Sequence, residues 1–400
     1  MARTRRSFVI YGYSSCVTLQ SEQVRTTERS SWLDVLRGLA IFGVVAVHSI
    51  QKTESLVLKN KSDFFFWLIS LGKYGVELFF FLSGWLLVSI YGINGKKLGK
   101  AYWARRMGRI YPLWILFLFI GFLRWEFTNS GHLNSPIKPI EGQSNFLHST
   151  AGVLVLTLSF TLFISASLWN SVIPGGWSIQ AEVAHYLLFP VIRNRSLNSV
   201  LKMVALINIL TSVGFLARPK LDALPSVFLK IIDAWFRLSL YSTVGYFLIG
   251  ILSYIVFSQM KESRITGLRF ADFNISHNTF LVFCISLLLI PCPFGNQIEA
   301  IGYLFMMILV SFGILRNQKL SSIFRFLGKH AYFIYFMHFL TLASVGWVTK
   351  RLNFTTSQLG AQQVVFILIF TYSLIISSFL AIPSMKFFER PIIRMAHKVK

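Results

Sequence analysis

Apolar stretches long enough to approach a membrane crossing recur along almost the whole chain, from residue 33 to residue 387. A membrane-spanning helix needs roughly 17–25 mostly apolar residues, because its backbone must form hydrogen bonds within the segment. Eleven stretches approach this pattern, near residues 33–50, 75–93, 111–125, 150–168, 177–192, 201–217, 238–257, 279–292, 300–315, 332–349 and 363–387. The pattern predicts an all-α polytopic membrane protein.

The positions of Lys and Arg predict which stretches cross the bilayer, because cytoplasmic loops carry an excess of these residues. If 150–168 crossed, the later basic loops would lie outside, whereas a re-entrant or interfacial 150–168 places them inside. These loops are residues 193–202, 258–277 and 316–330. We therefore predict about ten transmembrane helices, one partial helix and two cytoplasmic termini.

Three parts of the chain follow from the same pattern. Residues 1–31 are polar and are predicted to form a cytoplasmic N-terminal arm. Residues 32–394 form a single membrane domain, and residues 395–400 a cytoplasmic tail. Arg5 and Arg6 are not followed by a continuous apolar stretch, which argues against an export signal.

Charge and cysteine content narrow the class of protein. The 400 residues carry a formal net charge of +24 and are 54% hydrophobic. Basic cytoplasmic loops explain this charge in a membrane protein, so nucleic-acid binding is not expected. The 3 cysteines are too few and too scattered for a disulfide framework or a metal cluster. We expect no metal and no bound cofactor.

Arg37 and His48 lie in the body of the first apolar stretch, LDVLRGLAIFGVVAVHSI. Their spacing places them about 20° from a common helix face and about 16 Å apart along the axis. An arginine at the centre of a spanning helix costs roughly 2.5–3.5 kcal/mol, so a polar interior is expected there. Alternatively, the arginine reaches the membrane surface and the histidine bonds a neighbouring helix.

Two further polar clusters follow in the sequence. In GVELFFFLSGWLL, Glu77 needs a polar partner, while Ser83 and Gly84 are also typical of closely packed membrane helices. In RRMGRIYP, just before the third predicted helix, Arg106 and Arg109 share one helix face and can bind phosphates. Anchoring to anionic lipid is the alternative for these arginines.

The last two clusters lie in the second half of the chain. Glu182, His185 and Tyr186 are spaced i, i+3 and i+4 in GGWSIQAEVAHYLLFP, so they are expected to stand together. Tyr335 and His338 lie one helical turn apart in GKHAYFIYFMH. They either line a tunnel or hold two helices together by a hydrogen bond.

Taken in order, these clusters resemble the acyltransferase 3 family of integral membrane O-acyltransferases. The resemblance rests on Arg37-x10-His48, GVELFFFLSG, RMGRIYP, WSIQAE, GKHAYFIYFMH and FFERP, and covers about residues 33–394. Members transfer an acyl group, usually acetyl from acetyl-CoA, to a hydroxyl on an envelope glycan or other small acceptor. Some carry a fused SGNH-type domain, which this chain is expected to lack. His185 stands where the family usually has an aromatic residue.

The resemblance and the charge distribution together imply a donor site that faces the cytoplasm. The phosphates of the CoA donor would meet Arg37, Arg106 and Arg109, where charge-assisted hydrogen bonds are strong. Tyr335 and His338 would line the donor tunnel.

His48 is the predicted catalytic residue, because a neutral imidazole can act as a general base or as a nucleophile. Glu77 or Glu182 is expected to keep this imidazole basic and to fix its tautomer. Three residues are expected on the acceptor side, Ser83, Trp177 and Tyr186.

The predicted function is acyl transfer from acyl-CoA to a sugar hydroxyl of a surface or lipid-linked polysaccharide such as O-antigen, in the bacterial inner membrane. The expected partners are acyl-CoA, a glycan or glycolipid acceptor and the lipid bilayer. The choice between acetyl and succinyl stays open. A transporter or flippase of a glycan precursor is the main alternative, because polar residues within helices also mark substrate paths. A non-catalytic partner in glycan assembly is a further alternative.

Overall fold

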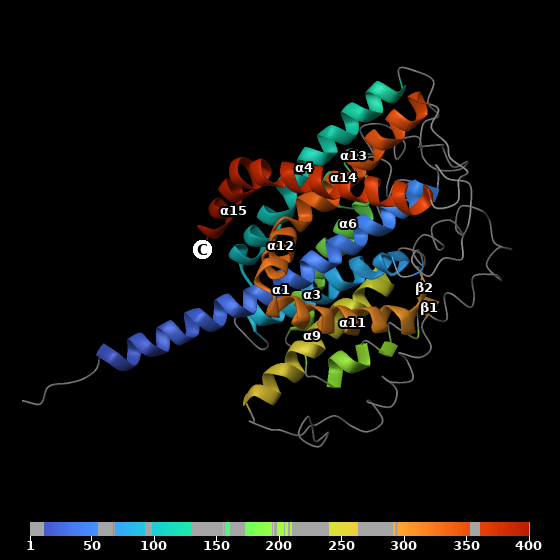
Figure 1. Ribbon diagram of the computed structural model, residues 1–400. Helices are drawn as coiled ribbons and strands as arrows, with labels where there is room; N and C mark the ends of the chain where they lie inside the picture. The colour runs from blue at the N-terminus through green and yellow to red at the C-terminus, as the bar shows by residue number, and fades with distance from the viewer. Residues whose placement is uncertain are drawn as a thin grey trace, which may run out of the picture.

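Helices form almost all of the structure, a computed structural model of the chain (Figure 1). It describes residues 12–54, 67, 69–92, 98–129, 155, 157–160, 173–193, 195, 198–203, 205–206, 209, 240–262, 291–292, 295–352 and 361–399. The helices are α1 (Gly12–Glu54), η1 (Leu71–Tyr74), α3 (Gly75–Tyr91), α4 (Lys100–Asn129), α6 (Gly176–Ile192), α9 (Leu240–Glu262), α11 (Gln297–Arg316), α12 (Gln318–Lys329), α13 (Ala331–Arg351), α14 (Ala361–Pro383), η5 (Ser384–Glu389) and α15 (Arg390–His397).

Helix α1 runs through the middle of the bundle, and its first part extends beyond the other helices (Figure 1). It contacts α3, α11, α12, α13 and α14. The predicted polar arm, residues 1–31, is helical from Gly12 onward and continues directly into α1. The central helix is therefore the one that carries Arg37 and His48.

Several helices have the length and apolar composition needed to cross a membrane. Within the part of the chain that the structure describes, four segments meet both conditions, Ser31–Glu54, Leu71–Tyr91, Ala331–Arg351 and Gln362–His397. Shorter apolar helices cover Thr243–Ser258 and Gly302–Arg316. The predicted stretches at 201–217 and 279–292 lie mostly outside the described residues. The count of ten transmembrane helices thus stays a prediction.

Two predicted boundaries are wrong. Arg106 and Arg109 lie inside α4 rather than before it, so the helix presents both guanidinium groups from a regular backbone. Residues 291–292, predicted to end an apolar helix, instead pair with residues 295–296 as the antiparallel strands β1 and β2. Prolines at 291 and 293 account for this difference, because proline cannot donate a helical hydrogen bond.

The predicted partial helix at 150–168 contains a turn among its described residues. Ser159 and Phe160 form this turn, and Phe160 has a φ of 57°. Trp114 of α4 stacks on Phe160 at a centroid distance of 5.1 Å and donates its indole N–H to the Thr157 carbonyl at 2.8 Å. The turn is thereby attached to α4, although the path of the rest of the stretch stays a prediction.

Gly84 and Gly250 bring the backbones of α3 and α9 into contact. A Cβ atom on Gly84 would collide with the carbonyl oxygen of Phe247, and one on Gly250 with that of Phe81. Small residues at helix crossings allow this close approach in membrane proteins. The close-packing explanation therefore holds for Gly84, whereas the neighbouring serine makes a polar contact described below.

Helix α12 crosses α1 through a second pair of glycines. A Cβ atom on Gly328 would collide with the carbonyl oxygen of Asp34, and one on Gly38 with that of Phe324. The Asn317 side chain caps α12 by accepting the backbone N–H groups of its first turn, at 3.0 and 3.2 Å. This crossing holds α12 and the start of α13 against α1.

The Gly84→Ala substitution should destabilise the protein by about 1–3 kcal/mol, because the added methyl group overpacks the crossing of α3 and α9. Thermal unfolding of detergent-purified protein should show a lower midpoint than the wild type. The matched control is Gly313→Ala on α11, where an added Cβ meets no described atom within 4 Å. Equal midpoints for the two variants would contradict the close contact.

Candidate active site

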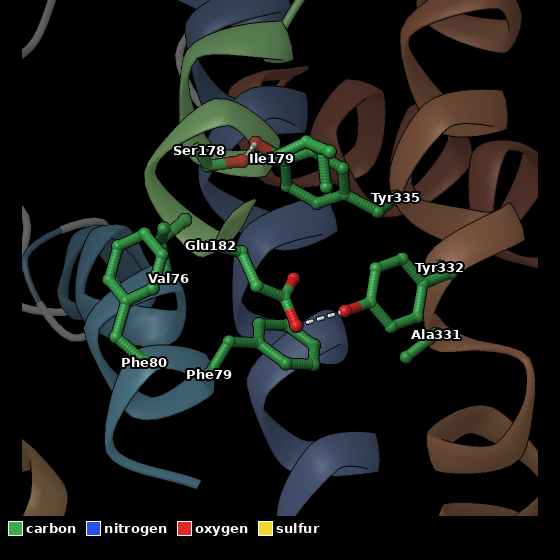
Figure 2. A pocket seen from close by; sticks show the side chains of 9 residues that line it. All are labelled: Val76, Phe79, Phe80, Ser178, Ile179, Glu182, Ala331, Tyr332 and Tyr335. Atoms are coloured by element: carbon green, nitrogen blue, oxygen red, sulfur yellow. Dashed lines mark hydrogen bonds between the residues drawn. The ribbon is translucent and has the colours of Figure 1, made fainter. Parts of the chain in front are cut away.

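Glu182 of α6 lies at the meeting point of three helices. Its Oε1 accepts hydrogen bonds from Ser83 of α3 at 3.3 Å, from Tyr186 of α6 at 2.5 Å and from Tyr332 of α13. Glu182 as a whole residue is 9% exposed. Figure 2 shows it pointing toward Tyr332 across a small cavity. Three hydroxyl groups replace the water that this carboxylate would bind at the surface.

The cavity beside Glu182 has a volume of about 30 Å³. Aromatic and aliphatic side chains form most of its wall, together with Ser178, Tyr332 and Tyr335. Ser178 donates to the Tyr335 hydroxyl at 2.7 Å, and Tyr335 donates to the Gly175 carbonyl at 3.0 Å. By volume, about two water molecules fit in the cavity.

Arginines of α1 and α4 surround the tyrosines that bind this carboxylate. The Arg109 Cζ lies 4.8 Å from the centroid of the Tyr332 ring, and the Arg106 Cζ lies 5.6 Å from that of Tyr186. Arg37 interacts electrostatically with Arg109 and with both tyrosines. The three arginines predicted to bind the donor are therefore gathered in one place.

Arg37 and Arg193 complete this group. Arg37 forms an ion pair of 3.1 Å with Asp34, one helical turn away. Arg193, just after α6, is 3% exposed and donates to the Tyr91 carbonyl at 3.2 Å. We call Arg37, Arg106, Arg109 and Arg193 the arginine cluster. Its four positive charges exceed the three carboxylates that interact with it among the described residues, those of Asp34, Glu182 and Glu389, so it favours an anion.

His48 lies at a second polar position, against α13. Its ring centroid is 5.3 Å from that of His338 and 4.8 Å from that of Phe339. The Nδ1 atom of His48 is 2.9 Å from Gln51 Oε1. The sequence predicts a carboxylate beside His48, whereas among the described residues the Gln51 amide lies there. Glu182 instead lies beside the arginine cluster, linked to it by Tyr186 and Tyr332.

His338 is fully buried and has a defined hydrogen-bonding pattern. Its Nδ1 atom lies 3.1 Å from the Ile334 carbonyl, which can only accept, so the proton is assigned to Nδ1. Its Nε2 atom has no hydrogen-bond partner among the described residues. The structure places His338 beside His48, and its position along a donor tunnel stays a prediction.

Glu77 lies in the first turn of α3 and is 5% exposed. The positive end of the helix dipole stabilises a carboxylate at this position. It interacts electrostatically with Lys73 and Tyr335, and its Oε2 has no hydrogen-bond partner among the described residues. Trp177, at the start of α6, packs edge-on against Phe80 of α3 at 6.5 Å. Both residues therefore lie near the junction of α3 and α6.

His185 contacts α9 and Phe80 of α3 and forms no hydrogen bond with Glu182 among the described residues, so the expected grouping of Glu182, His185 and Tyr186 is wrong for the histidine. Its ring stacks on Phe247 of α9 at a centroid distance of 4.7 Å. Its Nε2 atom is 3.2 Å from Thr243 Oγ1. The residue therefore has a packing role between α6 and α9.

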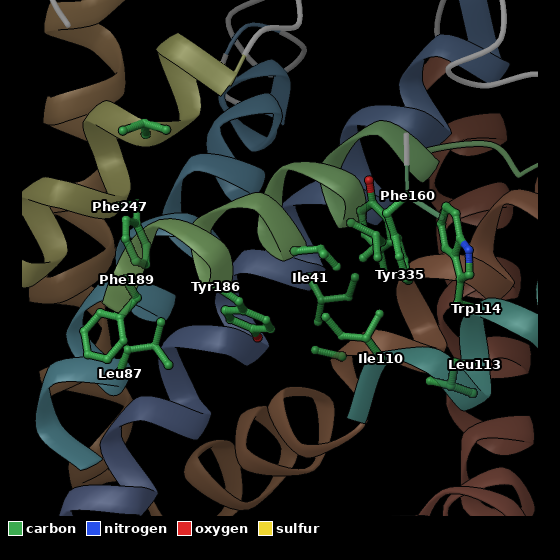
Figure 3. Packing of buried hydrophobic residues seen from close by; sticks show 14 of the residues in the cluster. Ile41, Leu87, Ile110, Leu113, Trp114, Phe160, Tyr186, Phe189, Phe247 and Tyr335 are labelled. Atoms are coloured by element: carbon green, nitrogen blue, oxygen red, sulfur yellow. The ribbon is translucent and has the colours of Figure 1, made fainter. Parts of the chain in front are cut away.

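The polar groups are enclosed by the main hydrophobic cluster of the protein. Figure 3 shows Tyr186 and Tyr335 within this cluster, among side chains that include Ile41, Ile110 and Trp114. Ile41 and Trp114 are 0% exposed. A low-dielectric surrounding of this kind strengthens the hydrogen bonds and ion pairs inside it.

Tyr332 and Arg193 are not among the site residues that the sequence predicts. Tyr332 lies three residues before Tyr335, which itself lies three residues before His338. This i+3 spacing places the three polar side chains near one side of α13 and was a usable signal. Arg193 resembles an ordinary loop arginine in the sequence, and only its burial in the structure distinguishes it.

Among the residues that the structure describes, no group of three or more His, Cys, Asp and Glu side chains could hold a metal ion.

These features define a helical membrane protein with a buried polar interior. The family model described as an acyltransferase domain matches residues 30–382. The chain therefore belongs to the acyltransferase 3 family, and it is a membrane acyltransferase. No curated protein and no solved structure matches it significantly.

The His185→Phe substitution should leave the protein folded, because an aromatic ring can keep the stacking on Phe247. We expect a change in the free energy of unfolding of at most about 1 kcal/mol, since only one neutral hydrogen bond is lost. His185→Ala should cost about 2–4 kcal/mol through the cavity that it leaves. Thermal unfolding of the purified variants checks both values. Equal destabilisation by Phe and Ala would contradict a packing role.

Proposed function

We propose that the protein transfers an acetyl or other short acyl group from acyl-CoA to a sugar hydroxyl of a surface or lipid-linked polysaccharide. The observation that carries this proposal is the separation of two polar groups along α1 in a member of an acyltransferase family. Arg37 belongs to the arginine cluster, and His48 lies against His338. The spacing along the helix axis is about 16 Å, which suits a donor that extends from one group to the other.

The arginine cluster is suited to the phosphates of CoA. Arg106 is 9% exposed, and its Nε atom has no hydrogen-bond partner among the described residues. A guanidinium group in such a place gains strong, bidentate hydrogen bonds from a phosphate. The donor therefore enters at the end of the bundle where α4 begins. The distribution of Lys and Arg along the sequence assigns this end to the cytoplasm.

His48 is suited to the chemical step. As the acceptor hydroxyl attacks the thioester carbonyl, His48 takes the hydroxyl proton, and the CoA thiolate leaves. Return of that proton to the thiolate yields the ester and free CoA. The His338 ring, packed against His48, belongs with the reacting groups in this arrangement. The acceptor reaches His48 from the side away from the arginine cluster.

The His48→Ala variant should lose acyl transfer by about 10²–10⁴-fold, the usual contribution of a general base. The test is mass spectrometry of the surface polysaccharide in cells that lack the native protein and express the variant. His397→Ala, an exposed histidine of α15, is the matched control. Full acylation with normal protein abundance in the His48→Ala strain would refute the assignment.

Replacing Arg106 and Arg109 together by alanine should weaken acetyl-CoA binding by about 100-fold, because two charge-assisted contacts to phosphate are lost. Equilibrium dialysis with labelled acetyl-CoA and detergent-purified protein measures the change. The control is Arg351→Ala, which removes an exposed arginine at the end of α13 far from Tyr332. It shows the effect of losing a positive charge outside the arginine cluster. Unchanged affinity in the double variant would leave lipid anchoring as the role of these arginines.

A further inference from the structure

Two tyrosines connect the Glu182 carboxylate to two arginines of the cluster. Tyr332 donates its hydroxyl to Glu182 Oε1, and Arg109 lies over its ring at 4.8 Å. Tyr186 donates its hydroxyl to the same oxygen at 2.5 Å, and Arg106 lies over its ring at 5.6 Å. Each tyrosine thus contacts the carboxylate with its hydroxyl and an arginine with its ring face.

This arrangement offsets the repulsion between two arginines of α4. Arg106 and Arg109 are one turn apart, and two like charges in a low-dielectric interior repel each other strongly. A tyrosine ring face attracts a guanidinium group, and the attraction increases where water is excluded. A hydroxyl bonded to a carboxylate fixes the ring in place and also polarises it in the favourable direction. The position of each arginine is therefore linked to Glu182.

Among the described residues, the hydrogen-bond partners of Glu182 are hydroxyl groups, and they do not include the proposed base, His48. The Glu182 Oε1 is shared by Ser83, Tyr186 and Tyr332. His48, the proposed base, has its Nδ1 atom beside Gln51.

We propose that Glu182 is a positioning residue, which holds Arg106 and Arg109 through Tyr186 and Tyr332 at the spacing that receives the donor phosphates. This inference rests on the proposed function, because it needs the arginine cluster to be the donor site. It assigns Tyr332 and Tyr186 to the donor side and leaves the acceptor side to residues nearer His48.

The first test is acetyl-CoA binding by equilibrium dialysis. Glu182→Ala should weaken binding by about tenfold, because both rings lose the bond that fixes them. Glu182→Gln should stay within about threefold of the wild type, since its carbonyl oxygen still accepts hydroxyl hydrogen bonds. The control, Glu54→Gln at an exposed position of α1, should leave the affinity unchanged.

Tyr332→Phe keeps the ring under Arg109 and removes only the hydroxyl. It should weaken acetyl-CoA binding about threefold with little change in thermal unfolding, and this loss should not add to that of Glu182→Ala. Wild-type affinity in the Glu182→Ala variant would overturn the inference. So would a Glu182→Gln variant that binds acetyl-CoA normally but no longer acylates the polysaccharide, because the carboxylate would then be catalytic.

The arginine variants separate this inference from the proposed function. If replacement of Arg106 and Arg109 weakens acetyl-CoA binding and Glu182→Ala does not, the donor site stands and the positioning role is wrong. If the arginine replacements also leave binding unchanged, the proposed donor site itself fails, and the positioning role fails with it.

Discussion

A charged side chain inside an apolar helix bundle is stable only when other polar groups replace the water that it has lost. Glu182 meets this condition through three hydroxyl groups that come from α3, α6 and α13. The arginines meet it through tyrosine ring faces, a backbone carbonyl and the carboxylate of Asp34. Because each charge needs several partners, these residues gather in one cluster, and the surrounding interior can stay aromatic and aliphatic.

The close helix crossings make such gathering possible. Glycines allow α9 to touch α3 and α12 to touch α1, so the side chains that project between the helices meet at short range. Helix α1 passes both polar groups, with Arg37 at one and His48 at the other. A donor that binds phosphates at the first group and presents its thioester at the second would use the whole length between them. Our functional proposal for this member of the acyltransferase 3 family is based on these two separate positions, one for donor binding and one for the chemical step.

Part of this organisation could be predicted from the sequence, because long apolar stretches identify membrane helices and a charge within one requires a polar interior. The shared face of Arg37 and His48 follows from helix geometry alone, as does the common side of Arg106 and Arg109. The ordered motifs also indicated the family, which the match to residues 30–382 confirms. The extent of α4 was not predictable, since an arginine-rich segment before an apolar stretch can be either loop or helix. The turn within 150–168 was not predictable either, since an apolar stretch can be a continuous helix or contain a turn.

The sequence by itself therefore determined the helical membrane class, the family and the polar residues that are candidates for binding or catalysis. Only the tertiary structure decided their partners, because helix periodicity does not specify how far each apolar helix is rotated about its own axis. Glu182 and Tyr332 are 150 positions apart, and nothing in either segment indicates that they meet. His185 and Tyr186 are both close to Glu182 in helical spacing, yet packing turns the histidine toward α9 and the tyrosine toward the carboxylate. The same rotation brings the His338 ring against His48.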